Sequence, residues 1–269
     1  MASQIGVCSY TVRDFMTNKT SFRDCLKRLQ ELGFEVWQGG KAACCDSISE
    51  MVDLLAEYGF KNITGSAGYD DLMSNLDKVI ADAKAFGVQH INTPTLPLKN
   101  RVSAQGYEAY AKEMNEVGKK LRDNGLKLIY HNHAMEFANF PGGKNGMQIL
   151  LDHTDPENFG FIMDTHWASA AGADPAEWVL KLEGRMDIIH FKDYAIDPNP
   201  EPKHIQDIGG VYKIFAEIGY GNINWKPIVE NCRKIGVQYF VIEQDYWRGC
   251  PIEALAKSKK YMNDVLDIH

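Results

Sequence analysis

Several features common in other classes of protein are missing from this sequence, and each absence narrows what the chain can be. No apolar run approaches the roughly 18 residues that a helix needs to cross a bilayer, so we expect no membrane-spanning segment. The formal net charge is -7 and the lysines and arginines form no cluster, which argues against nucleic acid as a partner. Neither a Gly-x-Gly-x-x-Gly stretch after an expected strand nor a phosphate-binding P-loop is present.

Cysteine is present but is not arranged for a metal site. The 6 cysteines are scattered and no two have Cys-x-x-Cys spacing, so a zinc–thiolate site is not indicated. Such scatter in a chain of this length favours reduced thiols and a reducing compartment. The first residues lack the basic and apolar regions of a signal peptide, so the expected location is the cytoplasm. A chain from which a signal peptide had been removed would look the same.

The length of 269 residues is usual for one α/β barrel, and a repeated local pattern supports that fold. Five times a helical stretch ends, one glycine follows, and an apolar run of strand length begins. Glycine most easily takes the left-handed conformation that closes a helix, so each following run is expected to be the next strand. These glycines are Gly33, Gly59, Gly87, Gly125 and Gly236.

The sequence predicts an α/β fold, a (β/α)8 TIM barrel in which residues 1–269 form a single domain. Residues 194–224 contain Pro198, Pro200, Pro202 and a Gly-rich turn, so we expect a long loop with a short helix over the barrel mouth. The eight expected strands lie near residues 4–9, 34–37, 61–64, 89–93, 126–131, 158–164, 186–191 and 239–243.

Polar residues collect where these strands end, above all in the second half of the barrel. The segment from Leu128 to His133 begins as an apolar run and ends in two histidines. Imidazole and carboxylate groups are costly to bury unless they are paired or bind a metal. Active sites of such barrels lie at the carboxyl ends of the strands. The strand-end residues are Gln38, Thr64, Asn92, His131 with His133, Asp164 with His166, His190 with Lys192, and Glu243.

The first ionisable residues after three successive apolar strands are Asp164, His190 and Glu243, so their side chains should converge. Each one alone could equally be a helix cap or part of a buried pair. With His131 beside them, the set favours one divalent metal ion held by His131, Asp164, His190 and Glu243. Mixed nitrogen and oxygen ligands suit Mn²⁺, Zn²⁺, Co²⁺ or Fe²⁺ and do not choose among them.

Two residues near the first histidine have candidate catalytic roles. His133 lies two positions after His131, so both point the same way on a regular strand, and one could bind metal while the other orients substrate. Glu136 could be a general base, an anchor or a ligand. Its phenylalanine neighbours indicate a buried setting, which would raise its pKa.

Other polar and aromatic residues near the strand ends could contact a substrate. Lys192 could polarise a carbonyl oxygen, and an ion pair with Asp164 or Glu243 is an equal alternative. Tyr10 and Trp167 offer aromatic faces that stack on sugar C–H groups, although such rings also plug barrel mouths.

As a set, these residues resemble the sugar phosphate isomerase/epimerase group of the xylose-isomerase-like TIM barrels over nearly the whole chain. The most specific stretches are Tyr130-His131-Asn132-His133-x-x-Glu136-Phe137, Asp164-x-x-Trp167, His190-x-Lys192-Asp193 and Gly219-x-Gly221-x-x-x-Trp225. The resemblance implies a divalent metal at the ends of strands five to eight and a small carbohydrate as substrate.

One departure from the group concerns the metal ligands. In the ketose 3-epimerase branch the ligands are Glu, Asp, His and Glu, and the two glutamates form the acid/base pair. Here the first position is His131, and only Glu243 remains of that pair. Either Glu136 takes the missing role, or the reaction differs from simple ketose epimerisation.

The resemblance implies a metal-dependent isomerase or epimerase that removes a proton next to the ketone of a keto-sugar through an enediolate. We expect Glu243 as base, Glu136 or His133 as its partner, and Lys192 and His166 as contacts to substrate oxygens. One alternative is a lyase that eliminates water or a β-glycosidic oxygen from a keto-sugar or inosose. Another is a metal-free sugar-binding barrel. Whether the chain forms a homo-oligomer is left open.

Overall fold

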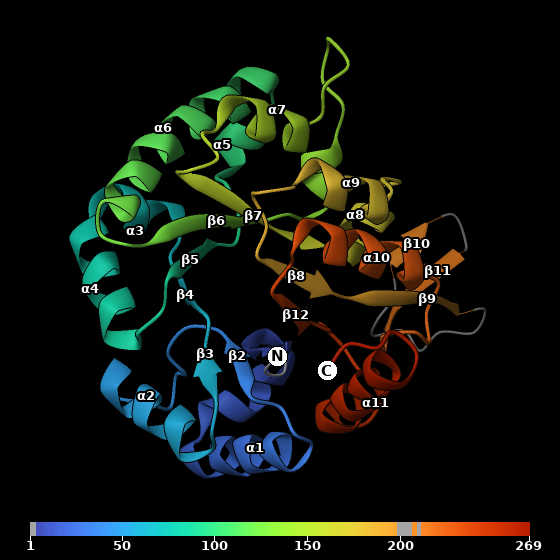
Figure 1. Ribbon diagram of the computed structural model, residues 1–269. Coiled ribbons are helices and arrows are strands. Elements are labelled where there is room, and N and C mark those ends of the chain that lie inside the picture. Colours follow the sequence, from blue (N-terminus) through green and yellow to red (C-terminus); the bar gives the residue numbers. More distant parts are fainter. Residues whose placement is uncertain (1–3, 198–205, 209–210) are drawn as a thin grey trace.

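A nearly closed parallel barrel forms the centre of the molecule, and helices surround it (Figure 1). The computed structural model describes residues 4–197, 206–208 and 211–269. Within this part, nine parallel strands hydrogen-bond in the order β3-β2-β1-β12-β8-β7-β6-β5-β4. They are β1 (Ile5–Cys8), β2 (Val36–Gln38), β3 (Lys61–Asn62), β4 (Thr64–Ser66), β5 (His90–Thr93), β6 (Lys127–His131), β7 (Phe159–Asp164), β8 (Ile188–Phe191) and β12 (Tyr239–Ile242).

The two outermost strands of this order complete the barrel. Only Ile63 separates β3 from β4 along the chain, so the two strands continue one path along the barrel wall. On one side β2 pairs with β3, and on the other β4 pairs with β5. The TIM-barrel prediction is therefore confirmed, with the expected strand at 61–64 divided into two.

Helices follow the strands along the chain as the alternating pattern predicts. The five glycines expected to close helices all have positive φ angles, from 69° at Gly87 to 80° at Gly236. The helices are η1 (Ser9–Thr17), α1 (Lys19–Glu31), α2 (Ile48–Glu57), α3 (Tyr69–Ser74), α4 (Leu76–Phe86), α5 (Leu98–Arg101), α6 (Ala104–Arg122), η2 (Ala134–Phe137), α7 (Gly146–His153), α8 (Thr165–Ala170), α9 (Pro175–Lys181), α10 (Trp225–Ile235) and α11 (Pro251–Asp264).

Two separate apolar layers fix which way each strand faces. A large cluster lies between the sheet and the helices, and a small cluster fills the barrel interior. Successive side chains of a strand point to opposite faces, so the residue two positions beyond an interior residue also faces inward. Five interior apolar residues are each followed, two positions later, by a polar residue that also faces inward. The pairs are Val36 with Gln38, Ile129 with His131, Ile162 with Asp164, Ile188 with His190, and Val241 with Glu243.

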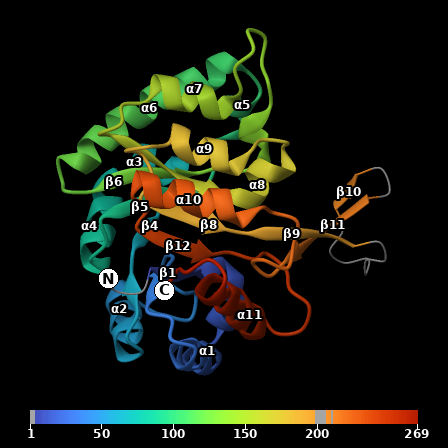
Figure 2. The ribbon, with the colours of Figure 1, turned by 45° about the vertical axis from the view of Figure 1, so that its right-hand side comes forward.

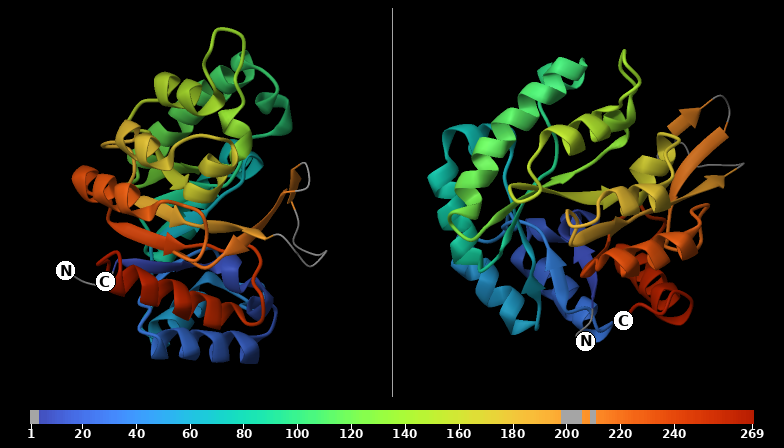
Figure 3. Two further views of the ribbon diagram at one scale, coloured as in Figure 1. Left: turned by 90° about the vertical axis from the view of Figure 1, so that its right-hand side faces the viewer. Right: turned by 45° about the horizontal axis from the view of Figure 1, so that its top comes forward.

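The prediction for residues 194–224 was wrong. Within the described residues this region holds a three-stranded antiparallel sheet and no helix, made of β9 (Asp193–Asp197), β10 (Gln206–Ile208) and β11 (Val211–Ala216). The sheet extends away from the barrel (Figures 2 and 3). Pairing from Tyr194 with Phe215 to Asp197 with Tyr212 supplies the backbone hydrogen bonds that a loop would lack. The three expected loop prolines and the Gly209–Gly210 pair lie outside the described residues.

The remaining global expectations concern termini, thiols and membranes. The amide of Gln4 donates to the carbonyl of His269 over 2.7 Å, so the first and last described residues meet (Figure 3). All six cysteines lie in the described part, and each is a free thiol. Among the described residues, no helix is long and apolar enough to cross a membrane.

Candidate metal centre

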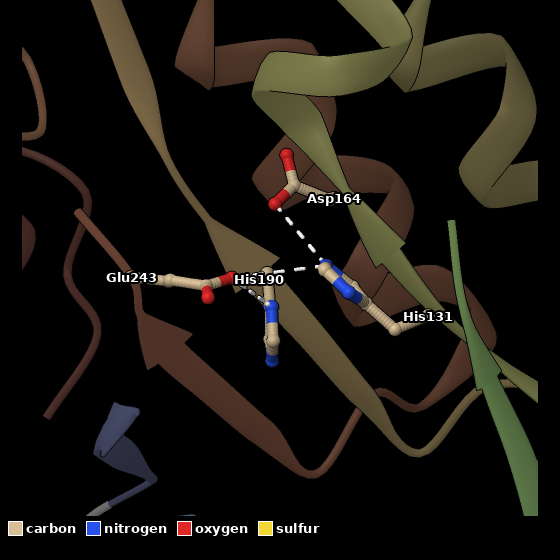
Figure 4. A group of neighbouring side chains, drawn as sticks. All are labelled: His131, Asp164, His190 and Glu243. Atoms are coloured by element: carbon tan, nitrogen blue, oxygen red, sulfur yellow. Dashed lines mark hydrogen bonds and ion pairs between the residues drawn. The ribbon is translucent and has the colours of Figure 1, made fainter. Parts of the chain in front are cut away.

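Four side chains from the second half of the barrel meet inside its carboxyl end, as Figure 4 shows. His131 and Asp164 end β6 and β7, His190 lies in β8, and Glu243 follows β12 directly. One possible ligand atom from each residue lies within 4.8 Å of those of the other three, and all four residues are buried. The structure therefore brings together the complete set of metal ligands expected from the sequence.

The start of a helix orients Asp164. One of its carboxylate oxygens, Oδ1, accepts a hydrogen bond from the backbone N–H of Trp167 and so caps α8. Its backbone N–H donates to the side-chain oxygen of Asn132. The other carboxylate oxygen, Oδ2, lies 3.3 Å from Nε2 of His131. Capping thus directs one oxygen to the helix and leaves the second for the cluster.

The two nitrogens of His190 each face an oxygen acceptor. Nε2 lies 2.7 Å from Oε1 of Gln38, and Nδ1 lies 2.7 Å from Oε2 of Glu243. A neutral imidazole has one N–H, so it can donate to only one of these two oxygens. A metal ion bound to Nδ1 would leave the hydrogen on Nε2, where Gln38 accepts it.

A lysine brings positive charge to the cluster but does not balance it. Nζ of Lys192 lies 2.7 Å from Asp245, 3.6 Å from Asp164 and 3.7 Å from Glu243. These three carboxylates face one ammonium group among the described side chains, which leaves a formal charge of about -2 when both histidines are neutral. Excess negative charge of this size in a buried site matches a divalent cation.

The pKa directions reflect the same imbalance. Burial opposes ionisation of Glu243, but Lys192 and His190 outweigh it and hold the pKa of that carboxyl well below its usual range. Burial would lower the pKa of His131, yet its bond to Asp164 and the charge of Glu243 raise it instead. A site that draws a proton onto an imidazole attracts cations, and a metal ion would displace that proton.

The donor set fits the implied ion chemically. Two imidazoles and two carboxylates are a familiar ligand set for divalent transition metals, and Gln38 gives one imidazole the outer hydrogen bond that such ligands usually make. His131, Asp164, His190 and Glu243 therefore form a candidate divalent-metal site.

A pocket of about 570 Å³ opens above this site. Its lining includes five of the residues expected to bind substrate or carry out catalysis: Tyr10, His133, Trp167, Lys192 and Glu243. Two of the ligands, His131 and His190, line it as well, whereas Asp164 is not among its lining residues. Glu136 and His166 are not among the lining residues.

Glu136 is fully buried beneath the turn that carries His133. Its carboxylate accepts hydrogen bonds of 2.7 Å from the Tyr130 hydroxyl and from the backbone N–H of His133. Burial raises its pKa, although those two hydrogen bonds oppose the shift; the direction is the one expected from the sequence. The structure thus gives Glu136 an anchoring position below the turn.

The two remaining histidines lie in different surroundings. His133 lines the pocket, and burial together with the nearby His131 lowers its pKa to about 4, so it is neutral at pH 7. His166 packs against Trp167 and Phe215, with ring centroids 4.7 and 4.8 Å away. Burial lowers its pKa to about 4 as well. His166 therefore contacts the projecting sheet through Phe215.

Sequence reasoning gave no role to two residues that matter here. Gln38 was recognised only as a strand-end residue, and its bond to His190 was not foreseen. The alternation from Val36 to Gln38 could have placed it inside the barrel with the ligands. Asp245 lies two positions after Glu243, so the same alternation could have placed it on the same side of the chain. Its carboxylate is the closest carboxylate to the Lys192 ammonium group.

Comparison with known proteins agrees with this geometry. A family model described as xylose isomerase-like TIM barrel matches residues 26–264. The chain belongs to the xylose isomerase-like TIM barrel family. This membership confirms the resemblance inferred from the strand-end motifs. The buried cluster described above remains the candidate metal site of this family member.

Proteins similar to this chain carry different names. An inosose dehydratase of Lacticaseibacillus casei is 29% identical over 170 residues, which cover 60% of this chain and 55% of that protein. A sugar phosphate isomerase/epimerase structure from Parabacteroides distasonis has a TM-score of 0.79 at 16% identity, with full coverage of both chains. A xylose isomerase-like TIM barrel protein from Mycobacterium smegmatis, solved with magnesium, has a TM-score of 0.71 at 18% identity, covering 98% and 97% of the two chains. Both structural likenesses concern the fold alone.

Proposed function

We propose that this chain is a divalent-metal-dependent lyase that removes water from a keto-sugar or an inosose. The observation that carries the proposal is the asymmetry of the pocket. Among its described lining residues, Glu243 is a carboxylate at the metal site, and the position of the second glutamate of the epimerase pair is taken by His131, with the imidazole of His133 beside it. Elimination needs one base next to the ketone, whereas epimerisation needs two comparable groups on opposite faces.

The relatives support this choice over epimerisation. The Lacticaseibacillus casei relative compared above is an inosose dehydratase, although the match spans only 55% of its length. The Mycobacterium smegmatis protein, which has the same fold, was solved in complex with magnesium. Held by His131, Asp164, His190 and Glu243, a divalent ion would stabilise negative charge on the ketone oxygen of a substrate.

The protein side chains then have distinct tasks. Glu243, through the oxygen that is not bonded to His190, accepts the proton from the carbon next to the ketone. The electrons of that C–H bond form a C=C bond as the β-carbon–oxygen bond breaks, and the protonated Glu243 returns its proton to the leaving hydroxyl, which departs as water. Lys192, held by Asp245, donates a hydrogen bond to the ketone oxygen, and His133 holds the leaving hydroxyl.

A ketose isomerase or epimerase is the second candidate. Its support is the structural likeness to a sugar phosphate isomerase/epimerase and the position of His133 as a possible partner of Glu243 across the pocket. In that case the proton returns to carbon and no bond to oxygen breaks. The mass of the product separates the two reactions.

The test is to incubate Mn²⁺-loaded protein with 2-keto-myo-inositol and with a panel of ketoses in deuterated water. A product lighter by one water supports the lyase, and an unchanged skeleton that gains deuterium next to the ketone supports the isomerase or epimerase. Glu243→Gln and chelator-treated protein are the controls and should do neither. Turnover that survives chelation would contradict both.

A further inference from the structure

The pocket offers little to a negatively charged substrate. Lys192 is the one lysine or arginine among the described residues that line it, and Asp245, Asp164 and Glu243 already surround its ammonium group. With a divalent ion bound, the formal charges of the cluster cancel, so a phosphate dianion would find no uncompensated cation there. Burying a charge without such a partner is strongly unfavourable.

One of the two loops whose backbone binds phosphate in other barrels is engaged by a side chain of this protein. TIM barrels often bind phosphate through backbone N–H groups in the loops after the seventh and eighth strands. In this chain the loop after β8 folds back onto Asp193. The Asp193 carboxylate accepts hydrogen bonds from the backbone N–H groups of Gly219, Gly221 and Ile223, with N···O distances of 3.0, 3.3 and 3.2 Å.

Two further donors complete the surroundings of Asp193. The ring N–H of Trp225 lies 2.8 Å from Oδ2, and the backbone N–H of Tyr194 lies 2.8 Å from Oδ1. A Cβ on Gly221 would come within 2.3 Å of Oδ1, so the loop is shaped around this carboxylate. The Gly-x-Gly-x-x-x-Trp motif is thus an internal anion site that Asp193 already fills.

The part of the pocket lining that comes from the first half of the barrel forms a wall that is polar but uncharged. It carries hydroxyl and amide groups from the first half of the barrel, and the side-chain oxygen of Asn92 is buried there without a hydrogen-bond partner. An orphaned acceptor of this kind favours a ligand that brings its own O–H donor. The groups of this wall are Ser9, Gln38, Thr64, Ser66, Asn92 and Thr95.

From these observations we infer that the substrate is an uncharged polyhydroxy ketone, without phosphate or carboxylate, and that Asn92 recognises one of its hydroxyls. The inference rests on the proposed function for the position of the ketone at the metal. It narrows the substrate class, because a phosphorylated ketose of the same skeleton is excluded by charge. The aromatic faces of Tyr10 and Trp167 on the rim are compatible with a neutral sugar ring.

The experiment compares matched pairs on the Mn²⁺-loaded protein by calorimetry: D-fructose with D-fructose 6-phosphate, and D-ribulose with D-ribulose 5-phosphate, with 2-keto-myo-inositol as a neutral cyclic probe. We expect the neutral probes to bind at least about tenfold more tightly than the phosphorylated ones. Equal or tighter binding of the phosphorylated partner overturns the inference, and so does failure of every neutral probe to bind.

A variant pair tests the role of Asn92. Asn92→Leu should weaken binding of the neutral probe about two- to tenfold while Mn²⁺ affinity stays unchanged. The matched control is Asn124→Leu, since Asn124 is exposed at the end of α6 and does not line the pocket. Equal affinities in both variants would remove Asn92 from recognition.

Failure of this inference is distinguishable from failure of the proposed lyase. If phosphorylated ketoses bind and lose water, the reaction stands and the inference falls. If neutral ketones bind preferentially but neither lose water nor exchange protons, the inference stands and the reaction falls.

Discussion

Both ends of the barrel carry clusters of charged side chains, but the two clusters differ in how far they are exposed to solvent and in their net charge. At the amino ends of the strands, Asp187 pairs with His90 at 3.1 Å and with Lys127 at 3.5 Å. The Asp187 side chain keeps 30% of its surface exposed, so water shares the charge. At the carboxyl ends, Asp164 and Glu243 are almost entirely shielded from solvent.

Charge balance is what separates the ends. The guanidinium of Arg185, another buried cation near the amino ends, donates to the carbonyls of Phe159, Leu151 and Thr154. The cluster of Asp187 is close to neutral, and such pairs stabilise a fold only modestly. At the mouth, by contrast, the carboxylates exceed the ammonium groups, which favours binding of a cation over stability of the empty site. We take this excess, rather than the presence of charge, as the mark of function.

The largest expected effect comes from removing the proposed base. Glu243→Gln should lower turnover of a keto-sugar by at least about a hundredfold, because it removes both a metal ligand and the proton acceptor. Asp187→Asn, at the opposite end, should leave turnover unchanged. The measurement is the rate of product formation at saturating metal. Comparable losses in the two variants would erase the functional difference between the two ends.

Metal ions should stabilise the folded protein through the site at the carboxyl ends of the strands and not through the amino-end cluster. At a free Mn²⁺ concentration of about 100 times the dissociation constant, the free energy of unfolding should rise by about 2.7 kcal/mol, provided the unfolded chain does not bind the ion. Differential scanning calorimetry with and without Mn²⁺ checks this. Asp164→Asn should lose most of the gain and Asp187→Asn should keep it. A gain that persists in Asp164→Asn would place the ion elsewhere.

A smaller effect is expected beyond the ligands themselves. Gln38→Leu removes the acceptor that fixes the hydrogen of His190 on Nε2, so Mn²⁺ affinity should fall about 10- to 100-fold. Gln38→Glu keeps an acceptor at this position and should retain most of the affinity. Metal titration of both variants is the measurement. Unchanged affinity in Gln38→Leu would mean that the His190 ring is held by its other contacts alone.

The smallest effect concerns acid and the amino end of the barrel. The hydrogen bond from His90, aided by Lys127, lowers the pKa of Asp187 below its ordinary value of 3.8 although burial opposes this. A carboxyl whose pKa is lowered by folding contributes stability above its unfolded pKa, and loses it as the pH falls through the folded value. Because the group is partly exposed, we expect about 1 kcal/mol or less.

Denaturant unfolding between pH 7 and about pH 2 measures this contribution, because the folded pKa of Asp187 lies below 3.8. The wild type should lose more stability over that range than Asp187→Asn, and the two should converge at the acid end. Parallel pH profiles would show that Asp187 adds nothing to the native state.

Much of this comparison could be predicted from the sequence. Ile129, Ile162, Ile188 and Val241 each precede a ligand by two positions, so strand alternation alone directs the ligands into the barrel. The order of parallel strands then brings successive tips together. The glycines that close helices also indicated where the strands begin, because the left-handed conformation of a glycine is a local property of the chain.

Other features depended on contacts between distant residues and were not foreseeable. The bond from His190 to Gln38 joins residues 152 positions apart, and the sheet of β9 to β11 forms through pairing across a proline-containing stretch. Glu136 looked like a candidate base because a carboxylate after a strand end suits that role. Its hydrogen bond to Tyr130 depends on how the turn folds back, which spacing does not determine.

The most direct test of the account is a calorimetric Mn²⁺ titration of chelator-stripped wild type beside Glu243→Gln and Asp187→Asn. The excess charge at the mouth predicts one tight site in the wild type, the same site in Asp187→Asn, and severe weakening in Glu243→Gln. Absence of binding in the wild type, or equal binding in Glu243→Gln, would contradict a metal centre at His131, Asp164, His190 and Glu243.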